Sequence, residues 1–385
     1  MSHSPEFAAQ AGALKQWMFE EALPLWARIG VDREGGGFFE RLAPDGAVID
    51  DPRRARLVAR QIYVFSAAER LGWAGPAREI VRHGLAALER HHLKPVGLVV
   101  PSVARDGTVV RAEFDLYDHA FVLFGLAAAA EIGEGSKPLA ARALALRDAM
   151  RAGFAHPIAG FEESRPPTVP LKANPHMHML EACLAWDMLA PARGWADLAD
   201  EIATLCLTRF IAPETGAVHE YFDRDWRALP AGDLAVVEPG HQFEWGWLLL
   251  RWGEGRGSAD ATSAALRMIA GAEAHGVDEQ LGLAVNELTP SLDARDNRCR
   301  LWPQTERVKA HALLAERASA GSNDAQAAQA ATASAVAGVR RFLVHPVAGS
   351  WWEHIGPQGV PAKEPARASS LYHIMGALEA VAHLT

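Results

Sequence analysis

The chain is dominated by the spacing of apolar residues that is typical of amphipathic helices. Apolar residues recur at i, i+3, i+4 and i+7 in long windows, whereas the apolar–polar alternation of a strand is nearly absent. Glycine and proline interrupt this spacing, for example at Gly72 and Pro191. The pattern predicts helices over residues 11–28, 54–71, 76–92, 116–132, 138–154, 175–189, 195–210, 240–252, 260–275, 302–320, 325–343 and 369–384.

The predicted helices alternate in chemistry along the chain. The odd-numbered ones are plain and rich in Ala, Leu and Arg, whereas the even-numbered ones recur about every sixty residues. Each even-numbered helix starts with a polar and aromatic cluster, and these clusters read ARQIYVF, DLYDHAF, NPHMHMLEA, EPGHQFEWGW, RLWPQTERVKA and SLYHIMGAL. We therefore predict an all-α fold, a single (α/α)6 barrel over residues 1–385 in which six helical hairpins form a toroid. A looser helical solenoid is the alternative.

Long connections precede the even-numbered helices, and they indicate where a site would lie. They span residues 93–115, 155–174, 211–239, 276–301 and 344–368. Loops of this length at one end of a barrel usually build its binding site. The starts of the inner helices would surround one pocket, where free backbone N–H groups and helix dipoles favour oxygen-rich ligands.

Composition narrows the class of protein. Hydrophobic residues make up 49% and charged residues 22%, as in soluble globular proteins. The longest apolar stretch, residues 120–130, is far below the ~18 residues that span a bilayer, and no signal peptide is apparent. The net charge of −9 and the absence of a dense Lys/Arg run argue against a nucleic-acid partner. We expect no membrane partner, while a homo-oligomer stays open.

The cysteines indicate a cellular compartment for the protein, and the tryptophans indicate a class of ligand. Cys183, Cys206 and Cys299 are widely spaced and form no CxxC pair, which favours a reducing cytoplasm. Twelve Trp against four Tyr is an unusual ratio, and flat indole faces suit the C–H faces of sugars. The plainer interpretation is that most of these indoles fill the core.

His241 and Glu244 are the first candidates for proton transfer. They stand one helical turn apart, on the same face as Trp245 and Leu248. A carboxylate one turn from a histidine can orient the imidazole and raise its basicity, which suits an acid–base catalyst near neutral pH. The alternative is a surface ion pair, against which the Trp-rich face argues.

His176, His178 and Glu181 resemble a metal-binding cluster. Two histidines two positions apart on a helix diverge by about 200°, so they cannot both bind one ion. HExxH and CxxC motifs are absent, and we expect no metal. Asn174, His178 and Glu181 are predicted instead to hydrogen-bond a polyol, with His176 directed elsewhere.

Arg60 shares a helix face with apolar residues, so its charge requires compensation by an anion. It either pairs structurally with Glu306 or Asp118, or it stabilises a developing oxyanion. Trp302 lies one turn before Glu306, and Tyr117 opens the fourth helix, so every even-numbered helix carries polar residues of this kind.

His373 is the only strongly polar residue of the last helix, which by itself fits a core histidine as well as a catalyst.

Motifs for nucleotide and acyl chemistry are absent: the chain has no P-loop, no GxGxxG after a strand and no GxSxG elbow. We therefore expect no cofactor.

Taken in order and spacing, the motifs resemble the N-acylglucosamine 2-epimerase family, which includes cellobiose 2-epimerases, mannose isomerases and sulfoquinovose isomerases. The resemblance runs from about Gly35 to His373 and includes GGGFFERLAPDG besides the helix clusters above. It implies an (α/α)6 barrel with catalytic His241 and His373, Arg60 at the C1–C2 oxygens of the sugar, and Glu244 as partner of the catalytic histidine. It further implies sugar contacts from Tyr117, Asn174, His178, Trp302 and Glu306.

The chemistry that follows is proton transfer next to a carbonyl. A histidine takes the C2 proton of an open-chain aldose, and Arg60 stabilises the cis-enediolate that forms. Returning the proton to C1 gives a ketose, whereas protonation of C2 from the other face gives the epimer. The motifs look closest to the mannose isomerase branch, so we expect a D-mannose/D-fructose isomerase, with 2-epimerisation as the runner-up. Because no Lys/Arg cluster accompanies the motifs, we expect an unphosphorylated sugar.

Two hypotheses from other classes remain. An inverting glycoside hydrolase could use the same toroid with Glu181 and Glu306 as its carboxylate pair. A non-catalytic protein-binding role is the other, although the full set of catalytic-type residues argues against it.

Overall fold

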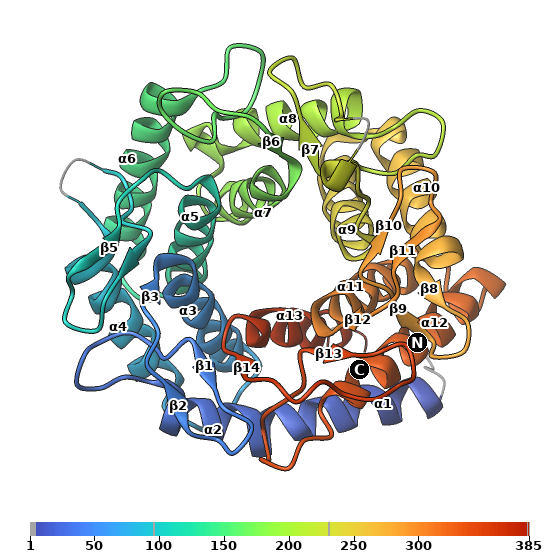
Figure 1. The fold of residues 1–385 in the computed structure, drawn as a ribbon, viewed down its shortest axis with the longest axis horizontal. Helices are drawn as coiled ribbons and strands as arrows, with labels where there is room; N and C mark the ends of the chain where they lie inside the picture. The colour runs from blue at the N-terminus through green and yellow to red at the C-terminus, as the bar shows by residue number, and fades with distance from the viewer. Residues whose placement is uncertain (1–4, 95–96, 230–231, 383, 385) are drawn as a thin grey trace.

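Two concentric rings of helices make up the molecule (Figure 1). The computed structural model describes residues 5–94, 97–229, 232–382 and 384. The inner ring is formed by α3 (Ala55–Arg70), α5 (Leu116–Glu131), α7 (Ala173–Leu189), α9 (Pro239–Arg256), α11 (Leu301–Arg317) and α13 (Ser370–Ala382). The outer ring is formed by α1 (Pro5–Trp17), α2 (Leu23–Leu25), α4 (Ala77–Ala87), α6 (Ser136–Phe154), α8 (Trp195–Leu205), α10 (Ala259–Gly276) and α12 (Asn323–Phe342).

Contacts between helices close the inner ring. Each inner helix packs on the next, from α3 through to α13, and α13 packs back against α3. Helix α1 packs on α12 and α13, so the N-terminal segment fills the outer position beside the C-terminal helices (Figure 1). The predicted mostly helical fold is confirmed, and the even-numbered predicted helices are those of the inner ring.

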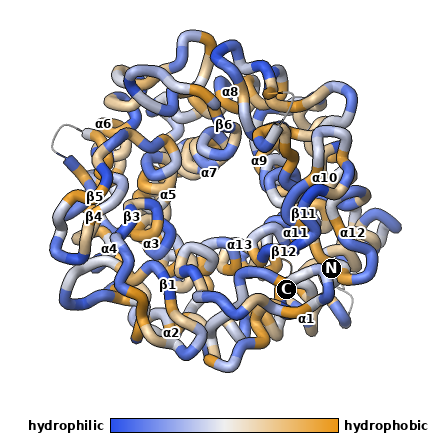
Figure 2. Tube along the Cα trace, in the orientation of Figure 1, coloured by the Kyte–Doolittle hydropathy of each residue, from blue (hydrophilic) through white to orange (hydrophobic). Residues whose placement is uncertain are grey.

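The two rings bury different amounts of their helices. Helix α6 of the outer ring buries a single stripe, Ala143, Leu146, Met150 and Phe154, as the helical period predicts. Helix α5 of the inner ring is buried on nearly all sides and hydrophobic along most of its length (Figure 2). Gly125 lets it approach α3 closely, because a Cβ there would lie 2.8 Å from a backbone oxygen of α3.

Short strands connect the loops that precede the inner helices. They are β1 (Arg41–Leu42), β2 (Val48–Ile49), β3 (Arg53–Arg54), β4 (Ser102–Val103), β5 (Val109–Arg111), β6 (Leu171–Lys172), β7 (Tyr221–Phe222), β8 (Val277–Asp278), β9 (Leu283–Ala284), β10 (Glu287–Leu288), β11 (Ala294–Asp296), β12 (Cys299–Arg300), β13 (His354–Ile355) and β14 (Ala366–Arg367). All pairs are antiparallel, in the orders β14-β1-β2, β3-β4-β5, β6-β7, β8-β9, β10-β11 and β12-β13. Strands of two or three residues are too short to produce a visible alternation in the sequence.

Most of the large indoles are core residues, as the plainer interpretation holds. Trp26 stacks on Trp351 at 4.9 Å between ring centroids, and Trp186 stacks on Trp195 at 5.8 Å. Trp245, one residue after Glu244, is also fully buried. In the described part of the chain, no helix is both long enough and apolar enough to cross a membrane.

Candidate active site

A cavity of about 560 Å³ opens where the inner helices begin. Its wall draws on the first turns of all the inner helices named above and on the loops that precede them. Eight of the predicted site residues line it: Arg60, Tyr117, Asn174, His178, His241, Glu244, Trp302 and His373. Residues far apart in the sequence therefore meet at one end of the double ring, as expected.

The two predicted catalytic histidines both lie next to the same indole, that of Trp302. The ring centroid of Trp302 is 4.9 Å from that of His241 and 5.7 Å from that of His373. Both imidazoles are nearly buried, with 5% and 8% of their surface exposed. A single small molecule stacked at this indole would therefore reach both imidazoles.

His241 is paired with carboxylates from the loop before its helix. Its Nδ1 lies 2.9 Å from Glu220 and 3.8 Å from Glu238. Burial lowers the pKa of His241, but the charges of Glu220 and Glu238 outweigh it and raise the pKa to about 10. His241 is therefore protonated at neutral pH and can act as an acid.

Glu244 does not contact Nδ1 of His241, so the expectation that it orients this imidazole is wrong, although its charge is among those that raise the pKa of His241. His241 stands in the first turn of α9 with its Nδ1 toward the loop, whereas Glu244 stands one turn deeper. There its carboxylate lies 3.8 Å from His178 and 3.9 Å from Lys309. Burial, and then the charge of Glu306, raise the pKa of Glu244 well above its usual value.

His373 has the opposite electrostatic environment. Its Nδ1 lies 2.7 Å from Glu306, whose other oxygen lies 2.6 Å from the ammonium of Lys309. Burial lowers the pKa of His373 to about 4, although the hydrogen bond and charge of Glu306 act to raise it. His373 is therefore neutral at neutral pH and can act as a base. Lys309 was not predicted, and its position one turn after Glu306 was the available signal.

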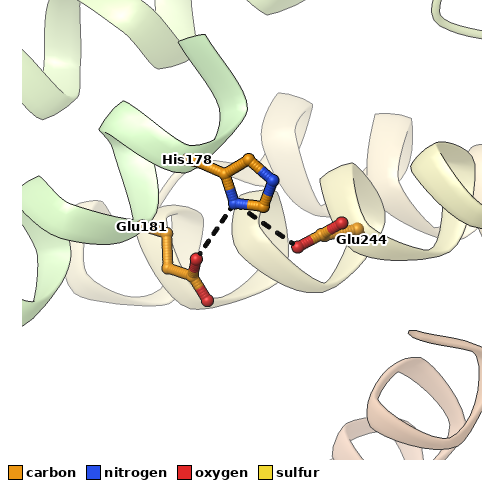
Figure 3. Close-up of side chains that lie close together, drawn as sticks. All are labelled: His178, Glu181 and Glu244. Carbon is orange, nitrogen blue, oxygen red and sulfur yellow. Dashed lines mark hydrogen bonds and ion pairs between the residues drawn. The ribbon is translucent and has the colours of Figure 1, made fainter. Parts of the chain in front are cut away.

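Figure 3 shows the cluster of His178, Glu181 and Glu244, in which α7 supplies the first two residues and α9 the third. His178 Nδ1 lies 3.2 Å from Glu181, which also accepts a hydrogen bond of 2.6 Å from the Tyr372 hydroxyl. Glu181 borders a second cavity, of about 500 Å³, formed by the last turns of the inner helices. We call the first cavity, of about 560 Å³, the upper cavity. Glu181 and Glu306, both predicted to contact sugar, are absent from its described lining.

His176 points away from the cavity, as predicted. Its Nδ1 lies 2.8 Å from the carbonyl of Lys172, and its Nε2 accepts a hydrogen bond of 3.0 Å from the Phe161 amide. Within the described residues, two other groupings have the spacing of a metal site: His178 with Glu181 and Glu244, and the trio Glu220, Glu238 and His241. Each of these groupings offers one nitrogen and two carboxylates.

Arg60 lines the cavity and forms no ion pair with any carboxylate of the described residues. Its Nη2 donates a hydrogen bond of 2.6 Å to the Tyr117 hydroxyl, and its guanidinium lies 4.0 Å from the centroid of Phe121. The suggested structural pairings of Arg60 with Glu306 or Asp118 are wrong: Lys309 and His373 occupy Glu306, and Arg56 occupies Asp118. The nearly buried charge of Arg60 thus remains available to an oxyanion.

Asn174 presents a second unused polar atom. Its Oδ1 is buried and has no hydrogen-bond partner among the described residues. Because buried polar atoms are normally paired, a ligand hydroxyl is a suitable partner for it. This placement agrees with the predicted polyol contact.

Basic residues surround the cavity more densely than the sequence suggested. Besides Arg60, its wall contains Arg54, Arg56, Lys172, Arg300 and Arg367. These residues come from four different loops or helix starts, so no run of charge reveals them in the sequence. The expectation that no Lys/Arg cluster accompanies the site is therefore wrong.

Comparison with known proteins shows likeness over nearly the whole chain. The family model of N-acylglucosamine 2-epimerase matches residues 37–377. The chain is 42% identical over 376 residues to a protein of Rhizobium meliloti named mannose-6-phosphate isomerase, covering 96% of each chain. A crystal structure of D-mannose isomerase matches with a TM-score of 0.86 at 20% identity over the full length of both chains. The cellobiose 2-epimerase of Bacillus thermoamylovorans matches with the same TM-score at 17% identity, over 97% of this chain and 99% of that one.

Proposed function

The chain belongs to the N-acylglucosamine 2-epimerase family of sugar isomerases and epimerases, and we propose that it interconverts an aldose and a ketose of the D-mannose/D-fructose type. The observation that carries this proposal is a pair of imidazoles that both contact Trp302. One of them lies beside two carboxylates, and the other lies beside a carboxylate that a lysine neutralises. The names of the relatives support a mannose-type sugar. The finer fold that we propose is a single (α/α)6 barrel of six hairpins.

In the first half of the proposed reaction, neutral His373 takes the C2 proton of the open-chain aldose. The C2–H electron pair becomes the C1–C2 double bond, and the C1 carbonyl oxygen takes up negative charge. Arg60 stabilises this charge while protonated His241 donates a proton to the oxygen, which gives a cis-enediol.

In the second half, His241 recovers a proton from the C2 hydroxyl, and His373 returns its proton to C1. The product is the ketose, and both imidazoles regain their starting states. The Nδ1 atoms face Glu220 and Glu306, which leaves Nε2 of each imidazole for the sugar. The conversion is redox-neutral, so these residues supply every proton transfer that it requires.

The runner-up is 2-epimerisation, which needs a proton delivered to the opposite face of C2. His241 would then protonate C2 instead of the oxygen. The inverting hydrolase is less well supported, because its carboxylates, Glu181 and Glu306, are engaged beneath the cavity by Tyr372 and Lys309.

Incubation with D-mannose, D-glucose or D-fructose in deuterated water, followed by NMR, tests the proposal. We expect fructose from mannose, with any solvent deuterium at C1 of the ketose. Deuterium at C2 of an aldose epimer would establish the epimerase instead, and no conversion of any of the sugars would refute both. His241→Ala and His373→Ala should each abolish turnover, whereas His275→Ala, exposed on the outer ring, should not.

The three cysteines are buried and free, which fits the proposed location in a reducing cytoplasm. Burial raises the pKa of the Cys183 thiol above its usual value, so this thiol stays protonated and unreactive.

A further inference from the structure

Arg300 and Arg367 are two arginines of the upper cavity that form no direct ion pair with a described residue, and we infer that they bind the phosphate group of a hexose 6-phosphate. The inference rests on the proposed isomerase function and specifies its substrate class. Both side chains are half-buried and line the cavity. No ion pair found among the described residues involves either of them.

The position of Arg300 relative to the imidazoles suits the far end of a hexose. Arg300 immediately precedes α11, and its guanidinium carbon lies 5.6 Å from the ring centroid of Trp302. The same indole contacts both His241 and His373. A sugar with C1 and C2 at the imidazoles would thus extend along Trp302 toward Arg300.

Arg367 stands on the neighbouring loop, and one residue joins it to Arg300. The backbone amide of Arg367 donates a hydrogen bond of 2.8 Å to the Glu353 carboxylate. The amide of Leu301, next to Arg300, donates one of 3.0 Å to the Glu353 carbonyl. The two arginines therefore flank the same residue of the cavity wall.

Glu353 forms no direct ion pair with either guanidinium group among the described residues, although the charge of Arg367 acts on its carboxylate. Its carboxylate already accepts hydrogen bonds from the Trp351 indole, the Arg367 amide and the Ser370 hydroxyl. The remaining carboxylate near Arg300 is Glu238, which lies 3.8 Å from the protonated His241. Glu353 thus has its own hydrogen-bond donors, and Glu238 lies beside the positive charge of His241.

Three other basic residues of the cavity, Arg54, Arg56 and Lys172, are already paired. Arg54 contacts Glu40 at 2.5 Å, and Lys172 contacts Glu163 at 3.1 Å. Arg56 contacts Asp118 at 3.3 Å. Apart from Arg60, to which we assign the enediolate oxygen, the cavity arginines that form no direct ion pair with a described residue are therefore Arg300 and Arg367.

A phosphate monoester fits this pair better than a sugar hydroxyl does. The planar guanidinium offers two parallel N–H donors that match two phosphate oxygens, and such charge-assisted bonds are about twice as strong as neutral ones. Two unpaired arginines are not required by a neutral hexose, whose hydroxyl groups can be bound by uncharged donors and acceptors.

The test compares D-mannose 6-phosphate with D-mannose as substrates of the whole chain and of Arg300→Gln and Arg367→Gln. We expect kcat/KM for the phosphorylated sugar to fall about tenfold to a hundredfold in each variant, mostly through KM. For D-mannose, kcat/KM should stay within about twofold of the value for the unchanged chain, because this sugar has no phosphate group for the arginines to bind. The matched control is Arg298→Gln, which removes an exposed arginine of the same loop, paired with Asp296 outside the described cavity lining.

Inorganic phosphate gives a second measurement that needs no turnover of a phosphorylated sugar. It should inhibit mannose isomerisation competitively, and more weakly in both variants. Circular dichroism and thermal unfolding establish whether each variant is folded, and Arg300→Lys and Arg367→Lys should recover part of the lost affinity.

Three results would overturn the inference. Turnover of mannose without turnover of its 6-phosphate would refute the phosphate subsite and leave the isomerase function standing. Equal losses for both sugars in the folded variants would show that the arginines do not act on the phosphate. No turnover of either sugar would remove the proposed function, and the inference with it.

Discussion

Glu220→Gln tests the claim that loop carboxylates set the protonation state of His241. The contact is 2.9 Å long, and both side chains are nearly buried. At an effective dielectric constant of about 20, the interaction of two unit charges at this distance is about 6 kcal/mol, or about four pKa units. Since structural relaxation offsets part of this, we expect the pKa of His241 to fall from about 10 by at least about two units.

The sign of the effect on activity follows from the role of His241 as an acid. Its protonated form is present below its pKa and is lost as the pH rises through that value. The basic limb of kcat/KM, measured by fructose formation between about pH 6 and pH 10, should therefore move to lower pH in Glu220→Gln. The Cε1 proton of His241 should titrate in NMR over the same lowered range.

Two further variants provide the comparison. Glu238 lies 3.8 Å from the imidazole, where the same arithmetic gives about 4 kcal/mol, so Glu238→Gln should shift the limb less. Glu214→Gln removes an exposed carboxylate of the same loop and should leave the profile unchanged. An unshifted basic limb in a folded, active Glu220→Gln variant would refute the assignment of His241 as the acid.

The remaining predictions concern charge and packing inside the ring. Lys309→Met leaves Glu306 buried without the ammonium group that pairs with it. The free energy of unfolding, measured in denaturant titrations, should therefore fall by about 3–5 kcal/mol. Arg60→Gln should reduce kcat about a hundredfold to a thousandfold in steady-state assays of a still-folded enzyme, because it removes the donor to the enediolate oxygen. Gly125→Ala should cost about 1–3 kcal/mol of stability in the same titrations, because its Cβ would meet backbone of α3, whereas Gly12→Ala, with no atom within 4 Å, should not destabilise.

The helices could be predicted because, within each segment, the apolar residues recur with the period of an α-helix. The predicted 302–320, for example, corresponds to Leu301–Arg317 in the structure. The closure of the rings carries no such local signal, since it depends on contacts between α13 and α3 at opposite ends of the chain. The predicted start at residue 11 also misses the first turns of α1, which begins at Pro5 and buries Phe7.

The position of His241, His373 and Arg60 at the cavity could be predicted because each belongs to a recognisable cluster at the start of an inner helix. Their electrostatic partners could not, because these are set by the course of the loops. Glu220 precedes His241 by a whole connection that returns to the same end of the ring. Glu244, one turn away on the helix itself, was the obvious partner and lies too deep.

The position of a residue along its inner helix also explains why Glu181 and Glu306 are absent from the cavity lining. Residues three or four apart share a helix face, but the second lies about 5 Å further along the axis. Glu181 follows His178 in this way, and Glu306 follows Trp302, so each acid lies below a residue that lines the cavity. These two carboxylates, the lower layer, are not among the residues that line the cavity of about 560 Å³. The lower layer holds the upper layer by hydrogen bonds and charge, as Glu306 does for His373, and helix periodicity alone does not distinguish these two functions.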